Sequence, residues 1–191
     1  MTSRTVLFFG SFNPIHRGHL QIARYMLDEG YGSRVWFVVS PQNPWKADAG
    51  LLEEGRRLEM VRRAIAGDAR MEACDVEFAM PRPSYTYRTL CVLRNRYPGR
   101  EFALAIGGDN LERFPEWRQA EDILTEFPVL VYPRPGARIP SWAEGRVTVA
   151  DAPQTDVSST EIRRKVRAGE PLTDEVPPAI LPLVEKYYRR Q

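Results

Sequence analysis

The stretch TVLFFGSFNPIHRGHL, residues 5–20, joins a short apolar run to a turn containing glycine and proline, and then to two histidines. Its apolar part, residues 5–9, is continuous rather than alternating, which favours a strand covered on both faces of a parallel sheet. Gly10 ends this run, and the pattern that follows predicts a helix from near Ile15. We therefore expect a strand, a tight turn and a helix in succession.

The same alternation continues along the chain. Further apolar runs lie at residues 35–39, 102–106 and 129–132, with a weaker candidate at 71–78. Between them, apolar residues recur three and four positions apart, as on one face of a helix, at residues 20–27, 58–65 and 86–97. Proline-rich loops are expected at residues 41–44, 81–83 and 133–140. Alternating strands and helices predict an α/β fold with right-handed crossovers.

The C-terminal part, from about residue 151, is predicted to be helical. Ser158 and Glu161 have the spacing of a capping box, which predicts a helix that runs towards Gly169. The apolar face of a last helix consists of Ile180, Leu183, Val184 and Tyr187. Proline disrupts the interior of a helix, so we place Pro182 in its first turn or at a kink. We expect residues 151–191 to pack on the sheet within one domain, residues 1–191.

Composition limits the class of protein. The chain has 191 residues, of which 43% are hydrophobic and 27% charged, as in ordinary soluble globular proteins. No apolar run reaches the roughly 18 residues of a membrane-spanning helix, so we expect a cytoplasmic protein without a membrane partner. Its 27 basic and 25 acidic residues nearly balance, which argues against a nucleic-acid partner. Cys74 and Cys91 lack the CxxC spacing of a metal site, and we expect reduced thiols.

His16 and His19 follow the first predicted strand, at the end of the sheet where open α/β folds bind ligands. We expect them on one face of the first helical turn, beside free backbone N–H groups and the positive end of the helix dipole. Gly10 and Gly18 are expected to leave room for a ligand near the backbone. Histidine pairs that bind metal on a helix are more often four residues apart. The pattern therefore favours phosphate binding and predicts no protein-bound metal.

Two motifs resemble one superfamily. Residues 10–19, GSFNPIHRGH, resemble the GxFxPxHxGH signature of the nucleotidylyltransferases, and residues 157–163, VSSTEIR, resemble their (I/V)SSTxIR element. The resemblance implies a Rossmann-like, doubly wound, mainly parallel sheet with a helical C-terminal extension. It also implies that His16, His19 and Arg163 contact the phosphates of ATP and act in catalysis. The other residues expected to bind ATP are Gly10, Ser11, Phe12, Gly18, Gly107, Asp109, Ser159 and Thr160.

Further segments resemble the nicotinate-nucleotide adenylyltransferases, namely residues 40–46, 83–87, 106–110 with Trp117, and 132–136. This resemblance implies transfer of the adenylyl group of ATP to nicotinate mononucleotide in NAD biosynthesis, by direct in-line displacement of pyrophosphate. Mg²⁺ is expected to be carried largely by the ATP phosphates. Trp117 is expected to stack on the pyridine ring and Thr86 to bind its carboxylate. The substrate-binding candidates are Lys46, Thr86, Trp117 and Arg134.

Several alternatives stay open, including assembly into a homo-oligomer. The acceptor is nicotinamide mononucleotide, or either mononucleotide, in one alternative and phosphopantetheine in another. A non-catalytic sensor on the same fold would bind the nucleotide without transferring its adenylyl group. Three residues depart from the common pattern of the family: Phe9, Asn13 and Arg88. Asn13 keeps the turn chemistry of an aspartate but lacks its negative charge.

Overall fold

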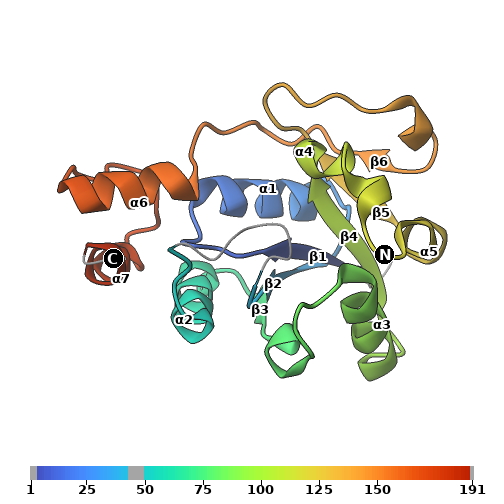
Figure 1. Ribbon diagram of the computed structural model, residues 1–191, viewed down its shortest axis with the longest axis horizontal. Helices are drawn as coiled ribbons and strands as arrows, with labels where there is room; N and C mark the ends of the chain where they lie inside the picture. Colours follow the sequence, from blue (N-terminus) through green and yellow to red (C-terminus); the bar gives the residue numbers. More distant parts are fainter. Residues whose placement is uncertain (1–3, 43–49, 190–191) are drawn as a thin grey trace.

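Parallel strands form the centre of the molecule (Figure 1). The computed structural model describes residues 4–42 and 50–189, and within them six strands lie in the order β3-β2-β1-β4-β5-β6, all paired in parallel. The strands are β1 (Arg4–Gly10), β2 (Arg34–Val39), β3 (Met71–Cys74), β4 (Glu101–Gly107), β5 (Val129–Tyr132) and β6 (Thr148–Val149). The predicted α/β fold with a parallel sheet is confirmed.

The strand order reverses at β1. The chain proceeds outwards from β1 to β2 and β3, and then returns to the opposite side of β1 with β4. Phe8 of β1 is therefore paired with Phe37 of β2 on one side and with Ala105 of β4 on the other. In sheets of this kind, ligands bind at the carboxyl ends of the strands where the order reverses. Gly10 and Gly107, the last residues of β1 and β4, mark that place.

Helices cover both faces of the sheet. One apolar core cluster contains residues of α1 (Arg17–Asp28) and α2 (Glu54–Ile65), and the other contains residues of α3 (Thr86–Arg96) and α5 (Ala120–Glu126). Side chains of β1 alternate between the two clusters, as the pleat of a strand requires. Strands covered in this way need apolar residues on both faces, which explains their continuous apolar sequence.

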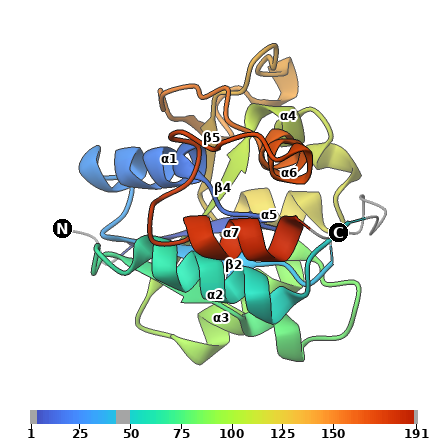
Figure 2. The same ribbon diagram turned by 90° about the vertical axis from the view of Figure 1, so that its left-hand side faces the viewer.

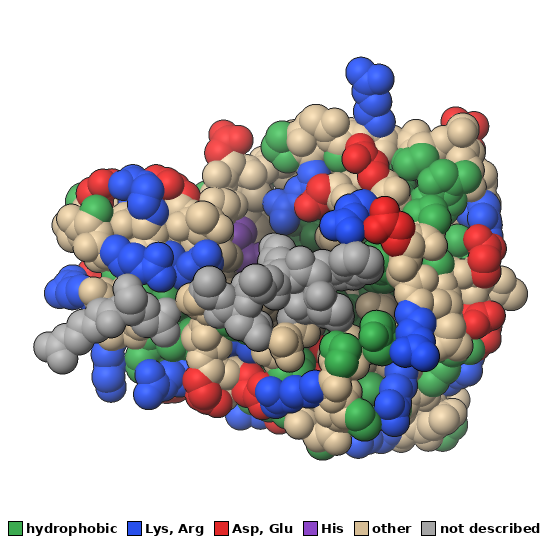
Figure 3. Space-filling model, viewed as in Figure 1, with side chains coloured by type: hydrophobic (Ala, Val, Ile, Leu, Met, Phe, Trp, Pro, Cys, Tyr) green, Lys and Arg blue, Asp and Glu red, His purple; other side chains and the backbone are tan. Residues whose placement is uncertain are grey.

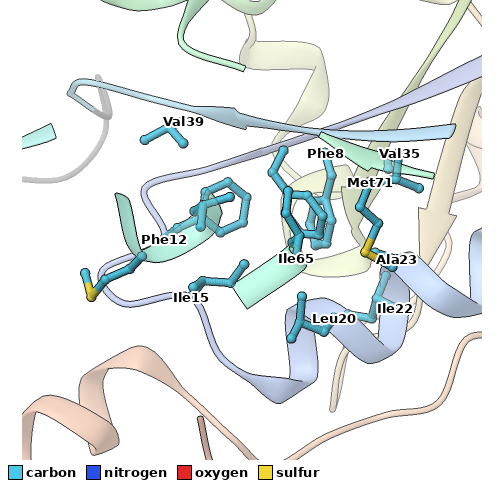
Figure 4. Close-up of a cluster of buried hydrophobic side chains, with 14 of the residues drawn as sticks. Phe8, Phe12, Ile15, Leu20, Ile22, Ala23, Val35, Val39, Ile65 and Met71 are labelled. Carbon is cyan, nitrogen blue, oxygen red and sulfur yellow. The ribbon is translucent and has the colours of Figure 1, made fainter. Parts of the chain in front are cut away.

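The turn after β1 is anchored in the first of these clusters. Figure 4 shows Phe12 and Ile15, which belong to this turn, beside Phe8 of β1 and Leu20 of α1. All four side chains are at most 2% exposed. The segment that leads from the central strand to the histidines is therefore held by apolar packing at both of its ends.

Some boundaries and short elements differ from the predictions. The strand predicted at residues 71–78 ends at Cys74, and a 3₁₀ turn, Val76–Ala79, follows it. In this turn Glu77 points inward and accepts hydrogen bonds from the hydroxyls of Ser84 and Thr89, so the chain leaves the sheet. The elements that the sequence did not predict are α4 (Gly108–Leu111), α5, β6 and the 3₁₀ turns Phe114–Glu116 and Ser141–Ala143.

The C-terminal part adds two helices, α6 (Ser159–Ala168) and α7 (Leu181–Tyr188). Ser158 caps α6 by accepting a hydrogen bond from Glu161 N at 3.2 Å, and Gly169 ends it with a φ of 70°. α7 has Pro182 in its first turn and lies beside α2 in both views (Figures 1 and 2). Tyr188, rather than the predicted Tyr187, is its fully buried tyrosine. Tyr187 donates a hydrogen bond from its hydroxyl to Glu59 of α2 at 3.0 Å.

The structure bears on the expectations of reduced thiols and of no membrane-spanning helix. Cys74 and Cys91 are both free and half-buried. Burial raises the pKa of the Cys74 thiol to about 11, so this group stays protonated near neutral pH. In the described part of the chain, no helix combines the length and the apolar character that crossing a membrane requires.

Candidate active site

The two histidines stack against each other at the start of α1. Their ring centroids are 3.7 Å apart, and His16 N donates a hydrogen bond to His19 Nδ1 at 3.2 Å. His16 has extended backbone and is the N-cap, so α1 begins at Arg17, two residues after Ile15, near which its start was predicted. Because Nδ1 of the neutral His19 ring accepts a hydrogen bond, its proton lies on Nε2. Figure 3 shows histidine atoms at the surface of a recess on this face of the molecule.

Both imidazoles are neutral in the free protein at neutral pH. Burial, with the nearby charge of Arg134 as a second cause, lowers the pKa of His16 from 6.5 to about 3. Burial, His16 and Arg134 lower the pKa of His19 in the same direction. His16 is 3% exposed, and its Nδ1 has no hydrogen-bond partner among the described residues. A buried nitrogen of this kind is a candidate contact for a ligand.

The glycines of the motif make room for side chains of the protein itself. A Cβ atom on Gly18 would lie 2.5 Å from Cγ2 of Thr155, so the space expected there for a ligand is filled by Thr155. A Cβ atom on Gly10 would lie 2.8 Å from the ring of Phe12. The Phe12 ring is buried and lies 5.1 Å from the His19 ring, centroid to centroid. The predicted contact of Phe12 with ATP would therefore involve its backbone atoms and not its ring.

The second motif docks on the first. Ser159 Oγ donates to Pro14 O at 2.9 Å, and Arg163 Nη1 donates to Asn13 O at 2.7 Å. Arg163 Nη2 also donates to Thr160 Oγ1 at 3.4 Å. The first two bonds join residues that are 145 and 150 positions apart in the sequence. They bring the N-terminus of α6 against the turn that leads into the histidines.

Asn13 uses both ends of its amide in this turn. Its Nδ2 donates to Gly50 O at 3.0 Å, while its Oδ1 accepts from Leu52 N at 3.2 Å and from the Tyr188 hydroxyl at 2.6 Å. An aspartate carboxylate has no hydrogen to donate to the Gly50 carbonyl. The asparagine at this position, one of the three departures from the family pattern, therefore has a structural reason.

Asp109 and Arg134 lie together beyond the carboxyl ends of β4 and β5. A Cβ atom on Gly107 would lie 2.3 Å from Asp109 Oδ1, so a glycine is needed for Asp109 to take its position. Arg134 Nε is 3.7 Å from Asp109 Oδ1, and this buried nitrogen has no hydrogen-bond partner among the described residues. The charge of Arg134 also lowers the pKa values of both histidines, which places Arg134 near them.

A cavity of about 700 Å³ opens beside Gly10 and Ser11. Two substrate-binding candidates line it: Thr86, the first residue of α3, and Trp117, whose ring centroid is 5.0 Å from that of Phe114. Arg134 is not among the lining residues, and Lys46 lies outside the described residues. The other residues that line the cavity are Phe9, Ser40, Gln42, Glu77, Ser84, Tyr85, Asn110, Arg113, Glu116 and Arg118.

Sequence reasoning missed Arg57, a fully buried arginine of α2. Its guanidinium donates to four backbone carbonyls, those of Leu52 (2.7 Å), Ser40 (2.9 Å), Pro41 (3.1 Å) and Ser11. These carbonyls belong to the loops after β1 and β2 and to the segment before α2. Arg57 therefore fixes the backbone at the carboxyl end of the sheet, a role that its place in an amphipathic helical pattern does not reveal.

Glu77 is a second functional candidate that was missed. This carboxylate is 2% exposed, lines the cavity and accepts hydrogen bonds from Ser84 Oγ at 2.9 Å and Thr89 Oγ1 at 2.7 Å. Burial raises its pKa, and the hydroxyls of Thr89, Ser84 and Ser40 act against that rise. The bonds tie the segment before α3 to the first turn of α3, where Thr86 lies. Nothing in the sequence around residue 77 indicates this network.

Comparisons with known proteins agree on one family. Residues 7–165 match the family described as cytidylyltransferase-like. A protein of Bacteroides fragilis named "Probable nicotinate-nucleotide adenylyltransferase" is 44% identical over 93% of this chain and 89% of its own length. A protein of Cytophaga hutchinsonii with the same name is 42% identical over 95% and 96%, respectively. The structure of Plasmodium falciparum nicotinic acid mononucleotide adenylyltransferase complexed with NaAD matches with a TM-score of 0.77 at 18% identity, over 97% of this chain and 94% of that one.

Proposed function

Because the chain belongs to the nicotinate-nucleotide adenylyltransferases of the cytidylyltransferase-like family, we propose that it transfers the adenylyl group of ATP to nicotinate mononucleotide. The products are nicotinate adenine dinucleotide and pyrophosphate. The observation that supports this best is the docking of Ser159 and Arg163 on the turn before His16. It assembles hydroxyl, guanidinium and imidazole groups from both ends of the chain at the carboxyl end of β1.

The reaction needs no nucleophile from the protein. An oxygen of the mononucleotide 5′-phosphate attacks the α-phosphorus of ATP and forms a new P–O bond. The bond between the α-phosphorus and the bridging oxygen of the leaving pyrophosphate breaks on the opposite side. Negative charge builds up on the pyrophosphate as it leaves, so catalysis consists of positioning the two substrates and stabilising this charge.

The histidines supply this stabilisation in our proposal. His16 and His19 are neutral in the free protein because they are buried near Arg134. Bound phosphates bring negative charge, which favours the protonated form of a histidine and raises its pKa. In either protonation state, an imidazole N–H group donates a hydrogen bond to a phosphate oxygen. Arg163 and Thr160 hold the leaving pyrophosphate, and Arg134 adds a fixed positive charge on the β4 side.

The remaining predicted contacts divide between the two substrates. We assign the acceptor to the cavity, whose volume lies within the range of about 300–1,000 Å³ that is typical of small-molecule sites. Trp117 stacks on the pyridine ring there, and Thr86 binds its carboxylate, as the resemblance implies. Lys46 stays a prediction as a phosphate contact. The other ATP contacts that we propose are those implied by the resemblance: Gly10, Ser11, Phe12, Gly18, Gly107, Asp109 and Ser159. Thr155 fills the space beside the Cα atom of Gly18, so Gly18 would contact ATP through its backbone N–H or C=O group.

Mg²⁺ would enter with ATP in this proposal. Mg²⁺ prefers oxygen ligands and keeps several waters, so phosphate oxygens suit it. Within residues 4–42 and 50–189, no three His, Cys, Asp or Glu side chains gather in a way that would hold a metal ion. In this proposal the substrate holds most of the cation's coordination sphere, and the cation would draw electron density from the phosphates. We also propose that the enzyme acts in the cytoplasm and has no nucleic-acid partner.

Pyrophosphate release tests the proposed function. In the presence of ATP and Mg²⁺, three acceptors are compared by kcat/KM: nicotinate mononucleotide, nicotinamide mononucleotide and phosphopantetheine. We expect nicotinate mononucleotide to be the preferred acceptor. Preference for either of the other two would identify a different transferase of the superfamily. Binding of ATP without pyrophosphate release with any of the three would identify a nucleotide sensor instead.

A further inference from the structure

Four charged side chains line the cavity, and three of them are engaged by neighbouring groups. Glu77 accepts hydrogen bonds from the hydroxyls of Ser84 and Thr89. Arg113 Nη2 donates to Glu116 Oε2 at 3.0 Å, so these two charges offset each other. The cavity therefore contains one cation and one anion that pair, and one anion that is held by hydroxyls.

The fourth charged side chain, Arg118, is in a different situation. It is exposed, and among the residues that the structure describes it forms no ion pair. Its guanidinium carbon lies 4.9 Å from the ring centroid of Tyr85, the residue that caps α3 and also lines the cavity. A cation–π contact restricts the side chain without neutralising its charge. Arg118 thus presents an available positive charge to the cavity.

Aromatic residues line the same cavity as this charge. Tyr85 lies under the guanidinium, and Trp117, the residue before Arg118, lines the same cavity. Aromatic side chains and a cation in one cavity suit a planar ring that has an anionic substituent. A pyridine ring with a carboxylate has this form. The corresponding carboxamide has the same ring but no charge.

We propose that Arg118 determines the choice between the acid and the amide form of the mononucleotide by binding the pyridine carboxylate. This inference rests on the proposed function and names the group that selects its acceptor. A guanidinium has only donors and a carboxylate only acceptors, so two parallel N–H···O bonds can form. A carboxamide offers one acceptor oxygen, and its NH₂ group meets the donors of Arg118. The residue therefore attracts the acid and disfavours the amide.

Kinetics with both mononucleotides test this inference. Arg118→Gln removes the charge, and Arg118→Lys keeps it without the paired donors. Arg88→Gln is the matched control, because Arg88 is an exposed arginine of α3, two residues after Thr86, that does not line the cavity. Pyrophosphate release is measured at saturating ATP with each mononucleotide, and thermal melting checks that all variants are folded. Calorimetry measures the binding of both mononucleotides independently of turnover.

We expect Arg118→Gln to lower kcat/KM for nicotinate mononucleotide about 10-fold, mainly through KM, since it removes one charged hydrogen-bonding partner of the bound substrate. The kcat/KM for nicotinamide mononucleotide rises, because its NH₂ group no longer meets the donors of Arg118, while the KM for ATP stays unchanged. Arg118→Lys is intermediate, and Arg88→Gln keeps the wild-type ratio. An unchanged acid-to-amide ratio in Arg118→Gln, in turnover or in binding, overturns the inference. Arg118-dependent binding of the acid without any turnover would support it and refute the proposed function instead.

Discussion

Acidification should destabilise the folded protein through His16. An unfolded histidine has a pKa of about 6.5, whereas burial lowers the pKa of His16 to about 3 in the folded state. Between these two values the unfolded chain binds a proton that the folded chain does not bind, so stability falls as the pH falls. One pKa unit corresponds to about 1.4 kcal/mol, so His16 costs about 2 kcal/mol of unfolding free energy at pH 5 and about 4 kcal/mol at pH 3.

Urea unfolding of the wild type and of His16→Asn at pH 7 and pH 5 measures this cost. Asparagine is a good N-cap residue and does not titrate, so the variant keeps a group suited to the start of α1. The titrating groups other than His19 are common to both proteins, and their effects cancel in the comparison. His16 also lowers the pKa of His19, so its replacement changes the contribution of His19 in the same direction. We expect the wild type to lose about 2 kcal/mol more than the variant between pH 7 and pH 5. Equal losses would refute the buried, neutral histidine on which the site geometry depends.

Three further predictions concern His19, Trp117 and Arg57. His19→Ala should lower kcat about 10²- to 10³-fold, the scale of losing one charge-stabilising donor, and near-wild-type turnover contradicts its role. Trp117→Leu should raise KM for nicotinate mononucleotide about 3- to 10-fold through lost stacking, with KM for ATP unchanged; equal effects on both values count against stacking. Arg57→Met leaves buried carbonyls without their donor and should lower the free energy of unfolding in urea by about 3 kcal/mol, so an unchanged value argues against the role of Arg57 in fixing these loops.

Elements that are buried on both faces were predictable from the sequence. Residues 129–132 were predicted as a strand and form β5, because all four of its residues are buried and apolar. β6 was missed because Thr148 and Val149 are both exposed at the edge of the sheet. The strand predicted at residues 71–78 is longer than the observed one. The inward turn of Glu77 depends on hydroxyls that come later in the chain.

In the site, features that arise from a short stretch of sequence were predictable, and features that depend on distant contacts were not. The histidine pair was recognisable because its geometry comes from one turn and the start of one helix. Arg57 was not recognisable, because its partners are backbone carbonyls, one of them 46 residues away at Ser11. Every residue has a backbone carbonyl, so the types of the partner residues do not indicate these bonds. The sequence also does not reveal that Thr155 fills the space at Gly18, since the two residues lie far apart in the chain.

The stereochemical course at the α-phosphorus tests the central claim, direct adenylyl transfer between two bound substrates, more directly than any other measurement. One diastereomer of ATP with a sulfur atom on the α-phosphorus is incubated with nicotinate mononucleotide, and ³¹P NMR gives the configuration of the product. A single in-line displacement predicts the thio-substituted dinucleotide with inverted configuration. Retention would reveal a covalent adenylyl-enzyme intermediate, and the absence of any dinucleotide would contradict the transfer itself.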